Sequence, residues 1–426
     1  MNRPQKRALI AFATLIFVLL TTFIIGALAR GYRFDFTKKE LKSTGLLVAN
    51  SIPNGAQVWI DNKLKTATDQ TIPLPPGQYK VEIKKPGYSP WKKNLQIDKE
   101  VAVTTNTYLF PLAPDLKALG FTEIANLNLS PDGTKAIYFI PSHIDTASSS
   151  AKTNTTTPII TDSLEEIGVG IIDLTEKTLG RSFKPRVLVK TRSDFNFDQA
   201  TVDWSPDSRK ILLTTFQNDD NKEFFILDTA QTYDFTAPPI ISTSPSQVSK
   251  TIAQWEKEKE LEKKGLLSKL PEEMKIILEE KCQATTFSPD ETKIFYKVTE
   301  AAKIPEKLIA KEIIGASTQK EERDLALGNW YLYDLKEDKN FLILKEEESE
   351  KIEIRWFPTS KHLLLIEKGE KVEIIEYDGT NRITVYAGPF ENSFVFPFPS
   401  GKSLLISTSL NGSEKKLPHL YAVSLQ

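Results

Sequence analysis

Five short segments with one shared pattern recur along the C-terminal part of this 426-residue chain. Each segment reads as a strand, a turn that contains proline, and a second, apolar strand. The marker prolines of the five turns are Pro131, Pro206, Pro289, Pro358 and Pro399. Because self-similarity along a chain is typical of repeat architectures, we expect several copies of one β unit rather than a single irregular core.

A second motif follows most of these segments. It is a short apolar strand that ends in an acidic or small turn, and its copies are residues 170–174, 224–228, 330–335, 372–379 and 420–425. Strand, turn, strand, strand is most of one blade of a β-propeller. The set resembles the propellers of the TolB and WD-repeat-like family, in which a Trp-Ser-Pro-Asp-Gly turn recurs once per blade. The segment Trp204-Ser205-Pro206-Asp207 matches that turn best.

The spacing of the marker prolines sets the expected number of blades. Successive prolines lie 75, 83, 69 and 41 residues apart, and only the last interval has the length of a bare blade, about 40 residues. The longer intervals therefore carry insertions, at about residues 141–164, 249–281 and 300–328. Without them, residues 113–426 have room for five blades, with six as the alternative. The stretch after Phe110 is expected to supply the closing outer strand.

The three insertions differ in character. The first is rich in Ser and Thr and is predicted to be a mobile loop, and the third is mostly polar. The second is predicted to be helical, with one helix that ends at Gly265, a typical C-terminal cap, and another that starts near Pro271. We expect the apolar stripe of the second helix to pack on the propeller or on the first helix rather than to bind a partner. The stripe consists of Leu270, Met274, Ile277 and Leu278.

The longest apolar run lies near the N-terminus. Residues 8–29 contain no charged side chain, and at about 1.5 Å per residue a helix of that length covers a hydrocarbon core of about 30 Å. We predict one transmembrane helix at residues 8–29, after a basic tail at 1–7 and before a linker at 30–42. The alternative is a signal peptide cleaved after Ala29, because residues 27–29 show the small-residue pattern of a cleavage site.

Positive charges flank both ends of the apolar run. Three precede it within residues 1–7, and five Lys or Arg follow it between residues 30 and 42. A simple count would place the C-terminal side in the cytoplasm, but the rule is read over short loops, and long domains translocate largely regardless of charge. We expect a single-pass protein of a bacterial cell membrane with extracytoplasmic C-terminal domains.

Residues 43–112 alternate short β-rich runs with turns of Gly, Pro and Asn. Residues 57–60 and 80–84 alternate polar and apolar side chains, which predicts two half-buried strands. The characteristic pieces are Ser51-Ile52-Pro53, Gly55-Ala56, Val58-Trp59-Ile60-Asp61, Leu74-Pro75-Pro76-Gly77 and Lys85-Pro86-Gly87-Tyr88. Their order resembles the PEGA domain, a small β-sandwich-like module of bacterial and archaeal surface proteins, although the name-giving tetrad reads Pro-Asn-Gly-Ala here. The resemblance implies a surface or adaptor module without catalytic residues.

Charge is unevenly distributed between the two regions. Residues 31–110 carry twelve Lys or Arg against seven Asp or Glu, a balance of +5, and residues 111–426 carry 39 against 49, a balance of −10. A basic domain beside a membrane is a candidate contact for anionic lipid head groups or wall polymers. The alternative is that the lysines keep a small sheet soluble and that the tryptophan packs in a core. The candidate contact residues are Lys80, Lys84, Lys85, Trp91, Lys92 and Lys93.

The sequence offers little material for catalysis. The single cysteine, Cys282, excludes an intrachain disulfide and a cysteine-cluster metal site, and the three histidines are not spaced for shared ligation. Phosphate-binding, zincin and nucleophile-elbow motifs are absent from the sequence. The carboxylates of the repeated turns, Asp132, Asp207 and Asp290, are expected to bond their own backbone rather than to react.

Together these features predict a mainly β protein with an N-terminal transmembrane helix, a PEGA-type β-sandwich and a five-bladed propeller, or a six-bladed one, with a helical insertion. We expect a membrane-anchored binding or scaffold protein of the cell envelope with a protein or polymer partner. We expect no catalytic site, cofactor, metal or nucleic-acid partner. The alternative is an exported propeller-type hydrolase or lyase acting on an envelope polymer, which would require reactive groups at the mouth of the channel.

Overall fold

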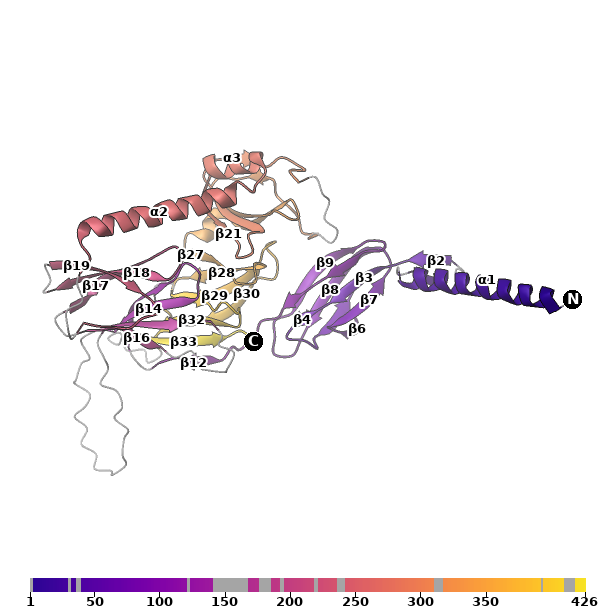
Figure 1. Ribbon diagram of the computed structural model, residues 1–426, viewed down its shortest axis with the longest axis horizontal. Helices are drawn as coiled ribbons and strands as arrows, with labels where there is room; N and C mark the ends of the chain where they lie inside the picture. The colour runs from indigo at the N-terminus through magenta and orange to yellow at the C-terminus, as the bar shows by residue number, and fades with distance from the viewer. Residues whose placement is uncertain are drawn as a thin grey trace, which may run out of the picture. The chain divides into compact units, whose positions relative to one another are not determined.

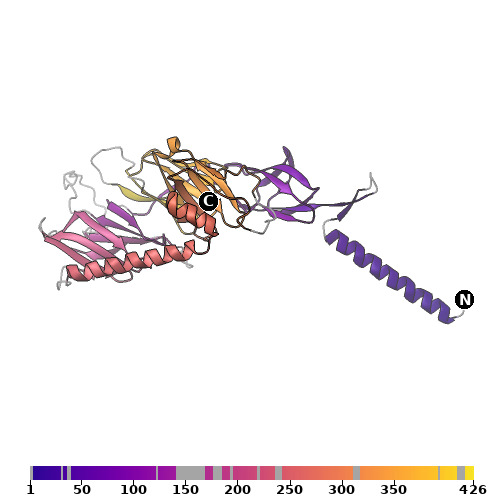
Figure 2. The same cartoon turned by 90° about the horizontal axis from the view of Figure 1, so that it is seen from above.

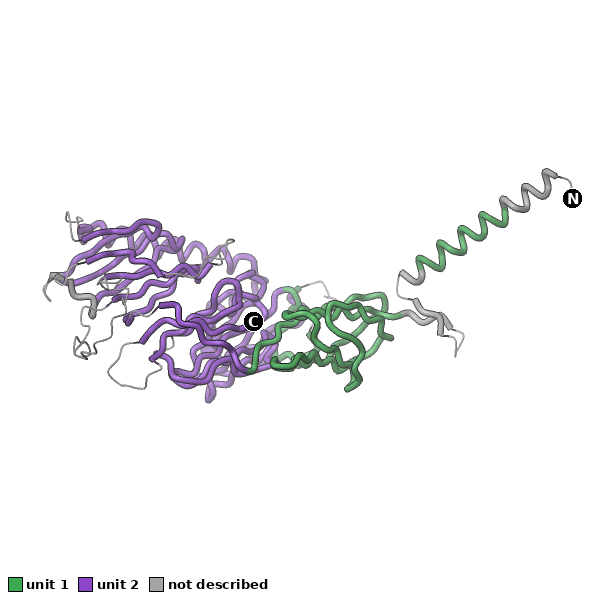
Figure 3. Tube along the Cα trace, turned by 90° about the horizontal axis from the view of Figure 1, so that it is seen from below, with its two compact units in different colours: residues 1–112, 309–322, 336–339 green, residues 113–308, 323–335, 340–426 purple. Residues whose placement is uncertain are grey.

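The computed structural model describes residues 3–29, 32–35, 40–120, 123–140, 168–175, 185–191, 195–217, 221–235, 242–309, 317–391, 394–409 and 418–426. The predicted loop at 141–164 lies outside these residues. The chain divides into two compact units (Figure 3). Unit 1 comprises Met1–Leu112, Ile309–Glu322 and Lys336–Lys339, and unit 2 comprises Ala113–Leu308, Arg323–Leu335 and Asn340–Gln426.

Helix α1 (Arg3–Ala29) covers the apolar run near the N-terminus (Figure 1). Its described large apolar side chains are exposed, among them Phe12, Phe17 and Phe23. Within the described residues, no helix combines the length and the hydropathy that a membrane crossing requires. The segment predicted to be a linker contains an antiparallel pair, β1 (Tyr32–Asp35) and β2 (Glu40–Ser43).

The PEGA-like region of unit 1 folds into short sheets around one core. A four-stranded sheet has the order β6-β5-β8-β9, a three-stranded sheet has the order β10-β3-β7, and β11 pairs with β4. Residues from both larger sheets, such as Leu47 and Val81, share one buried cluster, as a β-sandwich requires. The strands are β3 (Gly45–Ala49), β4 (Ser51–Ile52), β5 (Gln57–Ile60), β6 (Lys63–Ala67), β7 (Gln70–Leu74), β8 (Gly77–Lys84), β9 (Trp91–Ile97), β10 (Ala102–Thr104) and β11 (Thr107–Tyr108).

In the described part of unit 2, five sheets each start with one of the five predicted strand-turn-strand segments, and a sixth sheet of two strands lies in the third insertion (Figures 1 and 2). The first sheet contains β13 (Ala125–Leu129), β14 (Lys135–Ile140), β15 (Gly168–Asp173) and β16 (Arg186–Lys190), and the second contains β17 (Phe195–Trp204), β18 (Lys210–Gln217) and β19 (Asn221–Asp228). The third contains β21 (Cys282–Phe287), β22 (Lys293–Val298), β25 (Trp330–Asp334) and β26 (Lys339–Leu344), and the fourth contains β27 (Ile352–Trp356), β28 (His362–Glu367), β29 (Lys371–Glu376) and β30 (Ile383–Ala387). The fifth contains β31 (Val395–Pro397), β32 (Ser403–Thr408) and β33 (His419–Ser424).

Two of these sheets, the first and the fifth, gain an outer strand from elsewhere in the chain. Strand β12 (Leu116–Ala118) pairs with β33, so the stretch after Phe110 supplies the outer strand of the last sheet, as predicted. Strand β20 (Tyr233–Asp234) follows the second sheet in sequence but pairs in parallel with β16 of the first sheet. The third insertion contains a short antiparallel pair of β23 (Ala302–Lys303) and β24 (Asp324–Leu325), and α4 (Glu346–Ser349) precedes the fourth sheet.

Neighbouring sheets pack face to face through buried side chains. The first and second sheets share one cluster, which includes Ile137 and Leu213. The third and fourth share another, which includes Phe295 and Leu363, and the fifth packs on the first through Phe396 and its neighbours. This serial packing is typical of repeat units that bury their faces against each other.

Helices α2 (Pro245–Leu267) and α3 (Glu272–Glu280) bridge the second and third sheets. Val248 and Trp255 of α2 pack with Leu212 of the second sheet, whereas Leu267 and the predicted apolar stripe join the core of the third sheet. The first half of α2 therefore covers the second sheet, and the last turn of α2 together with α3 covers the third. Closure of the five sheets into a ring is not seen in the described residues.

The two helices test the predicted boundaries. Helix α3 begins directly after Pro271, and its stripe is buried, as predicted. The predicted stop at Gly265 is wrong, because α2 continues to Leu267 and is capped at Ser268. Burial of Leu267 and Leu270 in the third-sheet core outweighs the modest cost of about 1 kcal/mol for a glycine inside a helix.

Candidate functional site

The carboxylates of the repeated turns are structural, as predicted. Oδ1 of Asp207 accepts a hydrogen bond from the Ser205 hydroxyl at 2.6 Å and from the Arg209 amide at 3.1 Å. These two donors lower the pKa of Asp207 below its usual value. Asp132 and Asp290 form the same bonds in their own turns. These acids therefore hold turns in place and offer no free base.

The polar face of the PEGA sheet carries part of the predicted basic contact. Register pairs Glu82 of β8 with Trp59 of β5 and with Lys92 of β9, and alternation along β8 puts Lys80 and Lys84 on the same face. Glu82 is only 4% exposed. Its carboxylate lies 3.1 Å from the Lys80 ammonium and 2.5 Å from the Lys84 ammonium. Hydrogen bonding from Lys84, and then from Lys80, lowers the pKa of Glu82 despite its burial.

Two other candidate residues lie away from this face. The predicted surface role of Trp91 is wrong, because its side chain is 5% exposed and belongs to the domain core. Register pairs Lys93 with Val81 on the core side of the sheet, and its ammonium lies 6.0 Å from the Trp91 ring centroid. Trp91 thus packs in the core, which was the alternative given for it, because the period-two pattern in β9 cannot show by itself which face is buried.

Lys85 follows the end of β8, and its ammonium donates to the Asn54 carbonyl at 2.6 Å. The candidate contact therefore reduces to Lys80, Lys84 and Lys92 on the outer face, with Lys85 at its border.

Sequence reasoning missed two members of this outer face. Glu82 lies between Lys80 and Lys84 in the same alternating run, and this position was sufficient to predict that the three side chains share a face. Trp59 lies on the outer face, where its indole N–H donates to Gln57 at 3.2 Å and the Lys84 ammonium lies 5.0 Å from the ring centroid. The face is thus a compact set of cations that surrounds one buried carboxylate and one partly exposed aromatic ring.

A cavity of about 400 Å³ opens beside the first strands of the first and second sheets. Polar groups in its described lining come from amides and a hydroxyl, and the other lining side chains are apolar. The lining residues are Asn126, Leu127, Asn128, Phe139, Ala200, Thr201, Val202 and Phe394. The side-chain amide of Asn128 is already used in two hydrogen bonds within the protein. It accepts one from the Trp204 indole N–H at 2.9 Å and donates one to the Val202 carbonyl at 3.2 Å. This arrangement offers surface for binding rather than a reactive pair.

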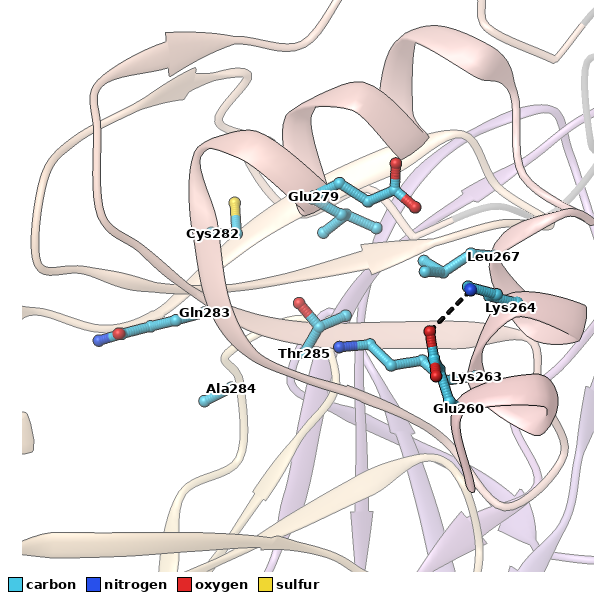
Figure 4. Close-up of a pocket in the computed structure, with 10 residues that line it drawn as sticks. Glu260, Lys263, Lys264, Leu267, Glu279, Cys282, Gln283, Ala284 and Thr285 are labelled. Carbon is cyan, nitrogen blue, oxygen red and sulfur yellow. Dashed lines mark ion pairs between the residues drawn. The ribbon is translucent and has the colours of Figure 1, made fainter. Parts of the chain in front are cut away.

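A second cavity of about 290 Å³ lies between α2, α3 and β21 (Figure 4). It contains charged side chains and lies beside Cys282. Burial raises the pKa of the Cys282 thiol to about 12, so the thiolate nucleophile is suppressed at neutral pH.

Within the described parts of the chain, no group of three His, Cys, Asp or Glu side chains is arranged to hold a metal ion.

Comparison with known proteins identifies the small β domain. Residues 44–111 match the PEGA domain family, so the chain contains a PEGA domain there, as predicted. No curated protein matches the chain.

Solved structures similar to the chain include TolB proteins. The putative TolB from Agrobacterium tumefaciens is 11% identical with a TM-score of 0.21, and the match covers 72% of this chain and 74% of that one. TolB from Acinetobacter baumannii is 11% identical with a TM-score of 0.21, with coverage of 82% and 60%. Oligogalacturonate lyase from Vibrio parahaemolyticus is 8% identical with a TM-score of 0.25, with coverage of 82% and 86%.

Proposed function

We propose that this PEGA-domain chain is a non-catalytic binding and scaffold protein of the bacterial cell envelope. In this proposal, α1 anchors the chain in the membrane as a single pass, the PEGA domain forms an extracytoplasmic stalk, and the five sheets of unit 2 form a propeller-type recognition platform. Its partner is an envelope protein or polymer. The protein needs no cofactor for this role.

The observation that carries the proposal is the apolar surface of α1. Residues 8–29 contain no charge, and the described large side chains from Phe12 to Ile25 are exposed to between 46% and 73%. A helix that is apolar all round is stable where lipid or protein covers it. The non-catalytic role is supported by the uncharged lining of the larger cavity, by the suppressed Cys282 thiolate and by the structural use of the turn carboxylates.

Membrane topology is tested by proteolysis of intact spheroplasts. If the domains are extracytoplasmic, added protease digests the region after Arg30 without lysis, because the polypeptide on that side of the bilayer is accessible. The cleaved alternative predicts a mature N-terminus at Arg30, which intact mass measures. Protection of the domains in intact spheroplasts, followed by digestion after lysis, would contradict the proposed orientation.

The outer face of the PEGA sheet is proposed to bind anionic lipid head groups electrostatically. Each lysine near an anionic surface contributes on the order of 1 kcal/mol, and such attraction weakens with salt. We expect residues 31–112 to cosediment with anionic vesicles at low salt. Lys84→Glu/Lys85→Glu/Lys92→Glu should abolish this binding, whereas Glu82→Gln should strengthen it, since it removes the one acid set among these cations.

A charge-matched control separates this face from net charge. Lys63→Glu/Lys65→Glu/Lys99→Glu makes the same change in charge on β6 and in the turn before β10, and it should retain most of the binding. Equal loss in both triple variants, or an absence of binding at low ionic strength, would leave the lysines with a role in solubility alone. Binding to purified cell wall but not to vesicles would move the target from lipid to a wall polymer.

A further inference from the structure

The cavity of about 400 Å³ lies where three sheets of unit 2 bring their first strands together. Strand β13 begins the first sheet, β17 begins the second, and Phe394 directly precedes β31 of the fifth. The Asn128 side chain of β13 donates to the Val202 carbonyl of β17, which holds these two strands side by side. The first sheet also packs on the second and on the fifth through buried clusters. The walls of the cavity are therefore fixed by the packing of three repeats.

Two polar side chains of the cavity are available to a ligand. Asn126 and Thr201 are exposed, and neither side chain forms a hydrogen bond or ion pair with the described part of the chain. Asn126 lies in a bulge of β13 and has a φ of +50°. Asparagine tolerates this left-handed conformation, and bulges re-aim side chains beside binding sites. The cavity thus offers an amide, which donates and accepts, and a hydroxyl.

Aromatic rings form much of the apolar wall. Phe394 is partly exposed and packs against the core of the first and fifth sheets, and Phe139 is almost fully buried. The faces of such rings attract C–H groups. None of the described residues that line the cavity carries a charge, so an ionic ligand would lose hydration there without gaining a counter-charge. The lining therefore favours a neutral ligand with both an apolar face and polar groups around it.

We propose that this cavity binds a neutral pyranose unit of a carbohydrate polymer. A pyranose ring has a face of C–H groups, which packs on Phe394, and a rim of hydroxyls, which bond to the Asn126 amide and the Thr201 hydroxyl. Two adjacent hydroxyls match an amide, because one donates to its oxygen while the other accepts from its N–H. The volume lies in the range of small-molecule sites.

This inference rests on the proposed binding role of unit 2 and names the class of ligand. A peptide fits the lining less well, because its backbone polar groups do not surround a flat apolar face.

The probes are the tetramers of glucose and of N-acetylglucosamine, which are neutral, and the tetramer of galacturonic acid, which is anionic. Isothermal titration calorimetry measures their binding to the full-length chain in a detergent without a sugar head group. We expect a neutral tetramer to bind with a Kd of about 1 mM or lower, and the anionic tetramer to bind about tenfold more weakly. Binding of the neutral tetramer should not change with salt, since no charge takes part.

Substitutions at the two exposed polar positions test the assigned contacts. Thr201→Val removes the hydroxyl at nearly constant shape and should weaken binding of the neutral tetramer about fivefold. Asn126→Asp replaces an N–H donor with a charge and should weaken it about tenfold or more. Asn381→Asp makes the same change at another asparagine with positive φ, before β30 of the fourth sheet and outside the cavity. This control should bind as the wild type does.

Three results would overturn the proposal. They are an absence of binding by both neutral tetramers at about 10 mM, unchanged binding in Thr201→Val and Asn126→Asp, and tighter binding of the anionic tetramer. Binding of the blocked peptide Asn-Thr-Asn-Thr in place of the neutral tetramers would overturn it in favour of a peptide partner. Proteolysis and vesicle cosedimentation measure topology and lipid binding separately, so failure of this inference is distinguishable from failure of the proposed function.

Discussion

Trp204→Ala is expected to destabilise unit 2 by about 3 to 5 kcal/mol, the usual loss for truncation of a buried tryptophan. The Trp204 side chain is 6% exposed and lies in the cluster that joins the first and second sheets. Its indole N–H also donates to Asn128 of the first sheet at 2.9 Å. The substitution therefore removes packing and a hydrogen bond between two repeats at once. Thermal or urea unfolding of the full-length chain measures the effect.

The repeat supplies a matched control. Trp356 holds the equivalent place before the turn of the fourth sheet and donates to Thr286 of the third at 3.2 Å. Its side chain is only partly buried, so Trp356→Ala should cost less than Trp204→Ala. Equal unfolding temperatures for Trp204→Ala and the wild type would remove Trp204 from the core and contradict the assigned register of the second sheet.

Lys293→Met is expected to destabilise unit 2 by a similar amount, about 3 to 5 kcal/mol, because it leaves a buried carboxylate without its cation. Lys293 is 7% exposed and Asp334 is 2% exposed, and their charged groups lie 3.2 Å apart. The Lys293 ammonium also lies 5.0 Å from the ring centroid of Tyr377 in the fourth sheet. Chemical unfolding of the variant gives the change in free energy.

A lysine-to-methionine substitution at the equivalent position of another repeat shows whether the loss of stability comes from burial of the charge or from the change of residue type. Lys210 is five residues after the turn serine of the second sheet, as Lys293 is in the third, but its side chain is exposed. Lys210→Met should change stability by no more than about 0.5 kcal/mol. The double variant Lys293→Met/Asp334→Asn should recover part of the loss, because the buried charge is then removed. A Lys293→Met variant as stable as the wild type would mean that the ion pair is not buried in solution.

Local patterns in the sequence were sufficient for the repeat units. The proline turns, the aspartates in three of them and the flanking apolar strands fix a hairpin without reference to distant residues, and all five predicted hairpins are present. The start of α3 at Pro271 and its buried stripe follow from equally local signals. The PEGA domain was recognisable because its turns and strands occur in a fixed order over residues 44–111.

Tertiary packing determined the end of α2 and the buried face of β9, for which the local sequence gives conflicting or insufficient information. Gly265 is a typical helix end, yet α2 continues to Leu267 because its last turn is buried against the third sheet. Alternation in β9 showed that Trp91 and Lys93 share a face, but only the second sheet of the PEGA domain shows that this face is the core. Which of two strand faces is buried depends on what packs there, and a single strand does not contain that information.

The sequence alone determined the identity and order of the repeat units, because turn chemistry and strand periodicity act between residues close in the chain. Only the tertiary structure brought Asn126 of β13, Thr201 of β17 and Phe394 around one cavity. It also brought α2 into contact with both the second and the third sheets. Residues far apart in the sequence come together in this way because their apolar faces are buried against each other. A pattern of residues along the chain does not show which distant segments will meet.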